Sequence, residues 1–163
     1  MIPRNEHPNP NFKRNDYIIL NGQWDFEFDF SDSGKERNMF AVDAPFSKKI
    51  TVPFCPESEL SGIGYKDFMA AVWYKRTVEI TEDQLKGKAF IVFGAVDFHA
   101  SVYVNGQLAG EHFGGYTSFR IDATKFLKAG KNTITVCAQD DTRSEEQRLN
   151  SSHYRISRMP SSA

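Results

Sequence analysis

Alternation of apolar and polar positions is the strongest regularity in this chain. Over residues 23–30 an aromatic ring occupies every second position, at Trp24, Phe26, Phe28 and Phe30. A period of two places these four rings on one face of an extended segment. The pattern therefore predicts a half-buried β-strand over residues 23–30, closed by the Ser- and Gly-containing turn that follows it.

Further short segments with strand character follow, with turn signals between them. We expect strands over residues 49–52, 71–80, 89–93, 100–104, 107–109, 117–121 and 131–139. Capped helical turns are expected only at residues 81–85 and 122–127, and no long amphipathic helix is predicted. Many short strands favour an all-β sandwich or barrel, because Rossmann folds and (β/α)₈ barrels need helices between their strands.

Local signals refine this picture. Asn105-Gly106 predicts a tight hairpin, since both residues accept the positive φ of a type I′ turn, and Gly114-Gly115 predicts a tight backbone turn. Residues 53–69 are rich in Pro, Gly and Ser, which indicates a long ordered loop of the kind that often carries function. Within residues 71–80 the alternation places Arg76 on an otherwise apolar face.

Composition and charge exclude several function classes. The 163 residues are 40% hydrophobic and include 14 Phe, enough to build a core without metal or disulfide links. The net charge is -1, with 20 basic and 21 acidic residues mixed along the chain, which argues against a nucleic-acid partner. No apolar run is long enough to cross a bilayer, so we expect no membrane partner. The first residues lack a signal-peptide layout, which leaves cytoplasmic and periplasmic locations open.

The composition also suggests boundaries within the chain. Residues 1–15 are polar and proline-containing and predict an N-terminal arm laid over the surface. Residues 16–147 are expected to form one folded domain. Residues 148–163 are Ser-rich and basic, without strand periodicity, and are expected to be a disordered tail or the remnant of cloning or truncation.

Residues able to bind metals or form disulfides are sparse. Cys55 and Cys137 lie far apart; one disulfide is possible, but two separate buried thiols are favoured. The four histidines are isolated from one another and no Cys/His cluster has zinc-site spacing, so no metal or cofactor is predicted. His99 alternates with apolar residues and is more typical of a structural histidine than of a ligand.

An ordered series of motifs resembles a known family. The series is Leu20–Phe26, Pro53-Phe54-Cys55-Pro56-Glu57, Trp73-Tyr74, Phe93-Gly94-Ala95-Val96-Asp97, Val104-Asn105-Gly106, Gly114-Gly115-Tyr116 and Asp140-Asp141-Thr142-Arg143. It is similar to the N-terminal sugar-binding domain of glycoside hydrolase family 2, the β-galactosidase and β-glucuronidase family, over roughly residues 16–147. The resemblance implies a jelly-roll β-sandwich like that of galactose-binding domains.

The resemblance also implies that catalysis takes place on a different domain. In this family the acid/base and the nucleophile are two glutamates on a separate (β/α)₈ barrel, which alone needs about 200 residues or more. The resemblance therefore implies a non-catalytic, carbohydrate-facing domain that rims the pocket of a retaining β-glycosidase. Its partners would be the terminal residue of a β-linked sugar and the remaining domains of the parent enzyme. A stand-alone carbohydrate-binding or lectin-like module, and a sandwich used only for protein contacts, remain as alternatives.

The end of the last strand holds the first candidate site residues. In the family an acidic residue at this place binds a hydroxyl of the terminal sugar, which implies this role for Asp140 or Asp141, with Asp141 favoured. Fixed carboxylates accept strong hydrogen bonds from sugar hydroxyls, although an Asx turn would explain the same residues. Arg143 of the same motif joins the predicted substrate-binding set.

The loop over residues 53–65 holds the second group. Its counterpart in the family approaches the same pocket, which implies that Glu57 and Ser58 lie near the sugar. Tyr65 is a candidate stacking platform for the apolar face of a sugar, whereas ordinary packing is favoured for Trp73. The adjacent Glu145-Glu146 are not expected to act as a catalytic pair, because a retaining pair must flank the sugar bond with its carboxyl groups about 5–5.5 Å apart.

Overall fold

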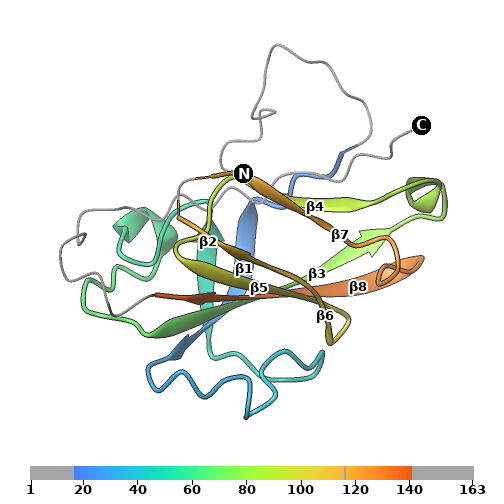
Figure 1. Ribbon diagram of the computed structural model, residues 1–163. Coiled ribbons are helices and arrows are strands. Elements are labelled where there is room, and N and C mark those ends of the chain that lie inside the picture. Colours follow the sequence, from blue (N-terminus) through green and yellow to red (C-terminus); the bar gives the residue numbers. More distant parts are fainter. Residues whose placement is uncertain (1–16, 116, 141–163) are drawn as a thin grey trace.

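The computed structural model describes residues 17–115 and 117–140, and these form an antiparallel β-sandwich (Figure 1). The all-β prediction is therefore confirmed. One layer is a six-stranded sheet in the order β2-β1-β3-β8-β5-β6, and the other contains the two-stranded sheet β4-β7. The predicted N-terminal arm and C-terminal tail lie outside the described residues.

The strands lie close to the predicted positions. They are β1 (Gly22–Asp29), β2 (Lys48–Val52), β3 (Ala71–Ile80), β4 (Phe90–Phe93), β5 (His99–Val104), β6 (Gln107–Phe113), β7 (Phe119–Asp122) and β8 (Gly130–Gln139). The prediction ended β6 too early, at residue 109. Of the two short 3₁₀ helices, η2 (Asp83–Leu85) lies in a predicted helical turn, but η1 (Glu59–Ser61) lies inside the segment predicted as loop. The hairpin between β5 and β6 has the predicted positive φ at Asn105 and Gly106, 52° and 81°.

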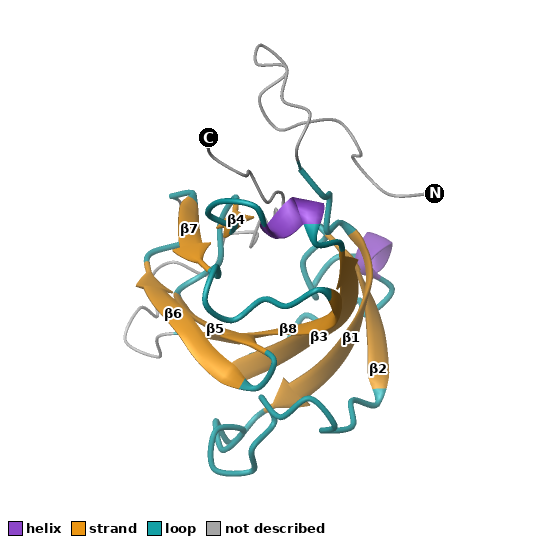
Figure 2. Cartoon of the chain, turned by 90° about the vertical axis from the view of Figure 1, so that its right-hand side faces the viewer, coloured by secondary structure: helices purple, strands orange, loops and turns teal. Residues whose placement is uncertain are grey.

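The core fills the space inside the curved six-stranded sheet. Figure 2 shows this sheet as a trough, with β4, β7 and loop segments lying over its opening. Phe26 from β1, Ile91 from β4 and Val136 from β8 are 0–1% exposed in this core. Burying each such side chain contributes about 1.5–3 kcal/mol to folding. The alternation seen in residues 23–30 thus marks the core-facing side of β1.

A second, smaller cluster lies on the outer face of the same sheet. Trp73, Tyr103 and Cys137 are buried there beneath the connection between β1 and β2, which contributes Met39 and Phe40. Trp73 is 0% exposed, so its interpretation as an ordinary packing residue is confirmed. The β1–β2 connection therefore acts as a cover for the outer face.

The cysteines do not pair. Cys55 and Cys137 are both free thiols, the first partly buried and the second buried. Burial raises the pKa of Cys137 to about 12; the charge of Lys35 opposes this rise, and the nearby Asp32 and Asp29 add to it. The thiol of Cys137 is therefore a packing group of the outer cluster.

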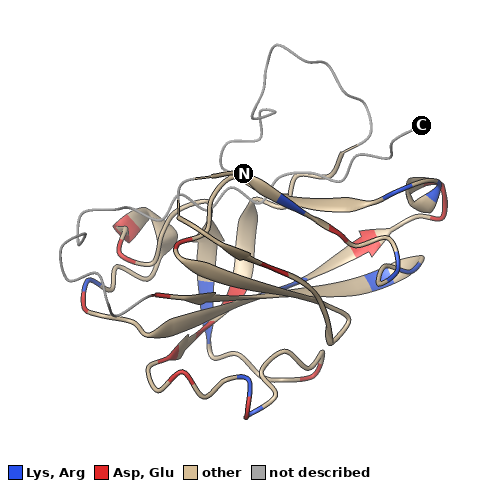
Figure 3. Ribbon diagram, viewed as in Figure 1, with Lys and Arg blue, Asp and Glu red and all other residues tan. Residues whose placement is uncertain are grey.

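Charged side chains are distributed over the molecule rather than gathered. Figure 3 shows Lys and Arg interspersed with Asp and Glu along the strands and loops. No helix among the described residues is both long and apolar enough to span a membrane.

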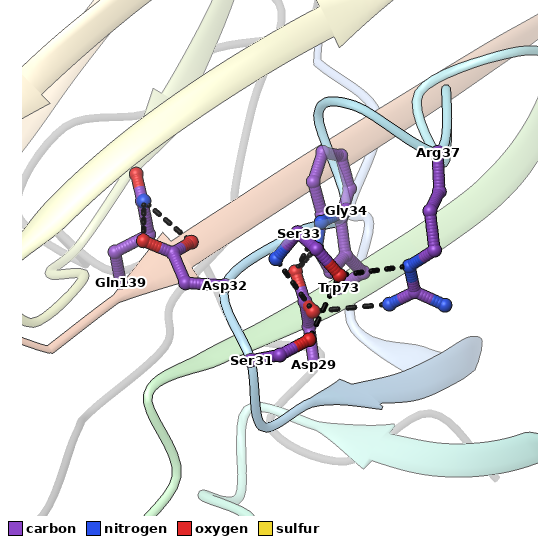
Figure 4. A network of polar contacts seen from close by, with 8 residues as sticks. All are labelled: Asp29, Ser31, Asp32, Ser33, Gly34, Arg37, Trp73 and Gln139. Carbon is purple, nitrogen blue, oxygen red and sulfur yellow. Dashed lines mark hydrogen bonds and ion pairs between the residues drawn. The ribbon is translucent and has the colours of Figure 1, made fainter.

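Asp29 holds the start of the β1–β2 connection in place (Figure 4). Its side chain accepts hydrogen bonds from Nε1 of Trp73 at 3.0 Å, the backbone N–H groups of Ser33 and Gly34 at 3.0 and 2.7 Å, and Nη2 of Arg37 at 3.0 Å. Burial by itself would raise the pKa of Asp29, but these hydrogen bonds to the charged carboxylate outweigh it and lower the pKa. Asp29 is therefore a satisfied buried anion.

Two cations of β3 also donate hydrogen bonds to backbone carbonyl groups. Nη1 of Arg76 donates to the carbonyl oxygens of Leu20 and Asn21 at 2.7 and 2.9 Å. Nζ of Lys75 donates to the carbonyls of Ala41 and Ala44 at 2.7 and 2.8 Å. The Arg76 contacts explain why a charged residue interrupts an apolar face: its side chain supplies hydrogen bonds to the buried backbone carbonyls of the segment that leads into β1.

Candidate functional site

One end of the sandwich brings together several segments that are far apart in sequence. The strand register aligns Asp29 with Ala71, Ala71 with Gln139, and Gln139 with His99 across the sheet. The next residues outward from this row are Phe30, Ala70, Asp140 and Phe98. We call this edge the Asp140 end. It is tied together by hydrogen bonds from the N–H of Asp140 to the carbonyl of Ala70 at 3.0 Å and from the N–H of Phe98 to the carbonyl of Gln139 at 3.1 Å.

Asp140 is exposed directly after β8. Ala138 belongs to the core, and Gln139 faces outward, where its Nε2 donates to both carboxylate oxygens of Asp32 at 2.7 and 2.8 Å. Because side chains alternate along a strand, Asp140 comes next on the core-facing side. The Gln139–Asp32 contact fixes the strand end from the opposite face.

Asp97 is a residue that the sequence did not single out. Burial raises its pKa, and the negative charges of Asp140 and Glu57 raise the pKa further. Like-charge repulsion of this kind requires the carboxylates to be near one another. The structure therefore brings Asp97, Asp140 and Glu57 to the same end, although they come from three different segments. The available signal was the position of Asp97 within the Phe93–Asp97 motif.

Gly115 makes room for the Asp97 carboxylate. A Cβ atom at Gly115 would overlap Oδ1 of Asp97, whereas the preceding Gly114 has the positive φ of 121° predicted for this turn. The two glycines thus serve different purposes, one for space and one for backbone conformation. Tyr116, the third residue of that motif, lies outside the described residues.

Glu57 and Ser58 lie in the loop that leads into η1, and they have different environments. Oγ of Ser58 accepts a hydrogen bond from the N–H of Leu60 at 3.2 Å, so this hydroxyl caps η1. Oε2 of Glu57 is buried and has no hydrogen-bond partner among the described residues. Burial raises the pKa of the Cys55 thiol, and the adjacent Glu57 charge raises it further. Of the two, Glu57 is the residue whose charge raises the pKa of Asp97.

Tyr65 packs in an aromatic cluster with Phe28 and Phe30. Its ring centroid lies 4.9 Å from that of Phe28 and 5.8 Å from that of Phe30, at tilts of 54° and 56°. The rings of Phe28 and Phe30 are stacked at 5.1 Å with an interplanar angle of 13°. Tyr65 is half-buried, but Phe30 is 56% exposed, so Phe30 is the open ring of this cluster.

The remaining candidates are placed elsewhere or not described. His99 stacks on Phe113 with ring centroids 4.1 Å apart, and its Nε2 lies 3.2 Å from Oε1 of Glu111, which agrees with a structural role. Asp141, Arg143 and the Glu145-Glu146 pair lie outside the described residues. Among the residues that are described, no three His, Cys, Asp or Glu side chains are grouped so as to hold a metal ion.

Comparison with known proteins identifies the family. The sequence profile of "Glycosyl hydrolases family 2, sugar binding domain" matches residues 18–149. This chain belongs to glycosyl hydrolase family 2. The resemblance carried by the ordered motifs is therefore confirmed, and the chain is a family 2 sugar-binding domain.

Curated relatives of this family 2 domain are glycosidases. A β-galactosidase from Thermoanaerobacter pseudethanolicus is 34% identical over 124 residues, which cover 76% of this chain and 15% of the relative. A putative β-glucuronidase from Formosa agariphila is 34% identical over 127 residues, covering 77% of this chain and 12% of the relative. The chain thus spans only a small fraction of the length of these relatives.

Solved structures of the family share the fold of the chain. A β-glucuronidase from an uncultured Clostridium species superposes with a TM-score of 0.70 at 23% identity, covering 88% of this chain and 28% of that one. The Bifidobacterium dentium β-glucuronidase, solved in complex with coumarin-3-O-glucuronide, gives a TM-score of 0.67 at 27% identity and covers 82% and 22% of the two chains. The predicted sandwich fold is confirmed by both.

Proposed function

We propose that this family 2 domain is the non-catalytic, carbohydrate-facing module of a retaining β-glycosidase, and that its Asp140 end rims the active-site pocket. The parent would hydrolyse O-glycosidic bonds as a β-galactosidase or β-glucuronidase does. The observation that carries the proposal is the match of residues 18–149 to the family 2 sugar-binding domain. The effect of the Asp140 and Glu57 charges on Asp97 supports the choice of this end as the one that would face the sugar.

The chemistry of this end suits a saccharide. Carboxylates accept strong hydrogen bonds from hydroxyl groups, and a sugar presents several hydroxyls along one edge. Asp140 is exposed at this end of the sandwich. The aromatic cluster beside it offers an apolar surface on which the C–H face of a sugar can rest.

The isolated chain is expected to show no turnover. Incubation with chromogenic β-galactosides and β-glucuronides should give no hydrolysis above a blank without protein, because the catalytic glutamates would come from another domain. Turnover above the blank that survives re-purification would contradict the non-catalytic assignment.

The carboxylates can be tested in the full-length parent enzyme. Asp140→Asn and Asp97→Asn keep the side-chain shape but weaken hydrogen bonding to hydroxyls, and we expect kcat/KM to fall about tenfold or more, as for the loss of a charge-assisted hydrogen bond. Asp83→Asn is the matched control, since Asp83 is exposed in η2, between β3 and β4, and pairs with Lys86. Equal kcat/KM in all three variants would remove the support for this site.

The same variants address the alternative of a stand-alone binding module. Such a module would bind sugar by itself, and the Asp140→Asn variant of the isolated chain would lose that affinity. The proposed role in the pocket predicts instead that the kinetic constants of the parent change.

A further inference from the structure

Phe30 has a solvent-exposed aromatic ring that is packed against two other rings. Phe28 stacks against the ring at 5.1 Å and nearly parallel, and Tyr65 supports it at a tilt of 56°. The ring nevertheless stays 56% exposed. A supported aromatic ring loses little conformational entropy when a ligand lies on it, which makes it a better platform than a free surface side chain.

The ring of Phe30 and the carboxylate of Asp140 are expected on the same side of the sheet. Phe30 continues the core-facing alternation of Phe26 and Phe28, and Asp140 continues that of Ala138. Phe30 and Asp140 flank Ala70 across the sheet end, so they are separated by two strand spacings, about 10 Å. A pyranose lying on the ring of Phe30 would therefore present its edge toward Asp140.

The charged groups that act on Asp97 are hydrogen-bond acceptors. The two charges that raise the pKa of Asp97 are both negative, from Asp140 and Glu57. Oε2 of Glu57 is buried without a donor among the described residues. The cation bound to Gln139 is Lys35, and the outward-facing side chain of Gln139 places that contact on the opposite face of the sheet. A ligand with hydroxyl donors and no negative charge complements this surface, whereas a uronate would add a further anion.

We propose that Phe30 is the stacking platform of a sugar subsite at the Asp140 end, and that this subsite accepts an uncharged pyranoside in preference to a uronide. The inference rests on the proposed function, because it takes the Asp140 end as the sugar-facing surface. It adds a residue outside the family motifs and a class of sugar.

The test is a titration of the 163-residue chain followed by amide NMR. Methyl β-galactopyranoside and methyl β-glucuronide are added at equal ionic strength. We expect saturable shifts at residues 30, 65, 97 and 140 with the galactoside, and a dissociation constant at least about fivefold higher for the glucuronide.

Variants of Phe30 separate stacking from simple apolar contact. Phe30→Ala and Phe30→Leu should raise the dissociation constant for the galactoside about fivefold or more, and Phe30→Tyr should keep it, since only a flat ring stacks on the C–H face. Phe113→Ala is the control, because Phe113 is 64% exposed at the end of β6 and packs against His99. The amide spectrum of each variant shows whether the fold is kept.

The results of the titrations distinguish this inference from the proposed function. Galactoside binding that Phe30→Ala leaves unchanged, equal or tighter binding of the glucuronide, or the absence of saturable shifts would each overturn the inference. The proposed function is judged separately, by the hydrolysis assay and by the parent-enzyme variants of Asp140 and Asp97. Shifts at residues 97 and 140 without any effect of Phe30 would overturn the inference while leaving the proposed function in place.

Discussion

Nε1 of Trp73 donates a hydrogen bond of 3.0 Å to Oδ2 of Asp29, joining β3 to the end of β1 beneath the β1–β2 connection. Trp73 is fully buried and Asp29 is 1% exposed, so neither group exchanges this contact for water. A buried indole N–H and a buried carboxylate each carry a desolvation cost that the pair offsets. The contact also anchors the chain just before Phe30, the ring proposed as a sugar platform.

Replacing the carboxylate should destabilise the domain without changing its shape. Asp29→Asn keeps the side-chain volume but turns one acceptor oxygen into a donor facing the N–H groups that now bind it. We expect the free energy of unfolding to fall by about 1–3 kcal/mol, measured by urea denaturation. Asp43→Asn, in the same connection, is expected to change stability by less than about 0.5 kcal/mol. Equal effects of the two substitutions would contradict the role given to Asp29.

The same carboxylate predicts a pH dependence with a definite sign. The pKa of Asp29 is lowered in the folded state, so its contribution to stability is present above the unfolded pKa of about 3.9 and is lost as pH falls through the folded value. The difference in unfolding free energy between wild type and Asp29→Asn should be constant between about pH 5 and 7 and narrow below about pH 4. A difference that widens toward low pH would mean that the carboxylate is not stabilised in the fold.

Gly115 should be sensitive to a single added methyl group. Gly115→Ala places a Cβ atom against the Asp97 carboxylate, so either the turn or the carboxylate must shift. Overpacking of this kind costs about 1–3 kcal/mol. In the double variant with Asp97→Ala the cost of Gly115→Ala should be at least halved, as thermal denaturation of the four proteins would show. An undiminished cost would place its origin in the backbone of the turn.

Thiol reactivity should report the Glu57 charge. Burial and then the Glu57 carboxylate raise the pKa of Cys55, which suppresses its thiolate. Glu57→Gln should therefore speed the reaction of Cys55 with a chromogenic disulfide at pH 8, whereas Glu59→Gln in η1 should not. Cys137, with a pKa of about 12, should stay unreactive until the chain unfolds. An unchanged rate in Glu57→Gln would remove the evidence for the contact between the two side chains.

Arg76 should be required for stability, although it lies on an otherwise apolar face of β3. Its Nη1 satisfies the carbonyls of Leu20 and Asn21, and Arg76→Met would leave these partly buried acceptors without that donor. We expect a loss of about 1–3 kcal/mol in chemical denaturation. Lys131→Met on β8 changes an exposed side chain and should stay within about 0.5 kcal/mol of wild type.

Local sequence patterns predicted most of the secondary structure of this chain. The alternation of residues 23–30, the Asn105-Gly106 hairpin and the helical turn at residues 81–85 act between near neighbours, so they are readable in sequence. The 3₁₀ helix η1 was not predicted because it is only three residues long, and the segment that contains it and its Ser58 cap has no periodicity. The β6 extension was missed because the pairing of Phe113 with His99 is a contact between strands.

The sequence singled out Asp140, Glu57 and Tyr65 one by one as candidate site residues, and their role in sugar binding stays a prediction. The hydroxyl of Ser58 is used as a helix cap, and the roles expected of Asp141 and Arg143 stay predictions because these residues lie outside the described range. Asp97 and Phe30 were not singled out. Asp is common in turns and Phe is common at strand ends, so neither residue type points to a binding site in the sequence. Only the side chains that surround them in the fold distinguish these two positions.

The sequence by itself determined the fold class, the strand positions and the family, because these depend on periodicity and on the order of short motifs. Only the tertiary structure decided that the charges of Asp140 and Glu57 act on Asp97 and that the ring of Phe30 stays exposed. The register of β1, β3, β8 and β5 places Phe30 and Asp140 at the same end of the sheet and aligns chain positions up to about a hundred residues apart. Proximity across a sheet is set by packing and hydrogen bonding over the whole domain, and no local pattern encodes it.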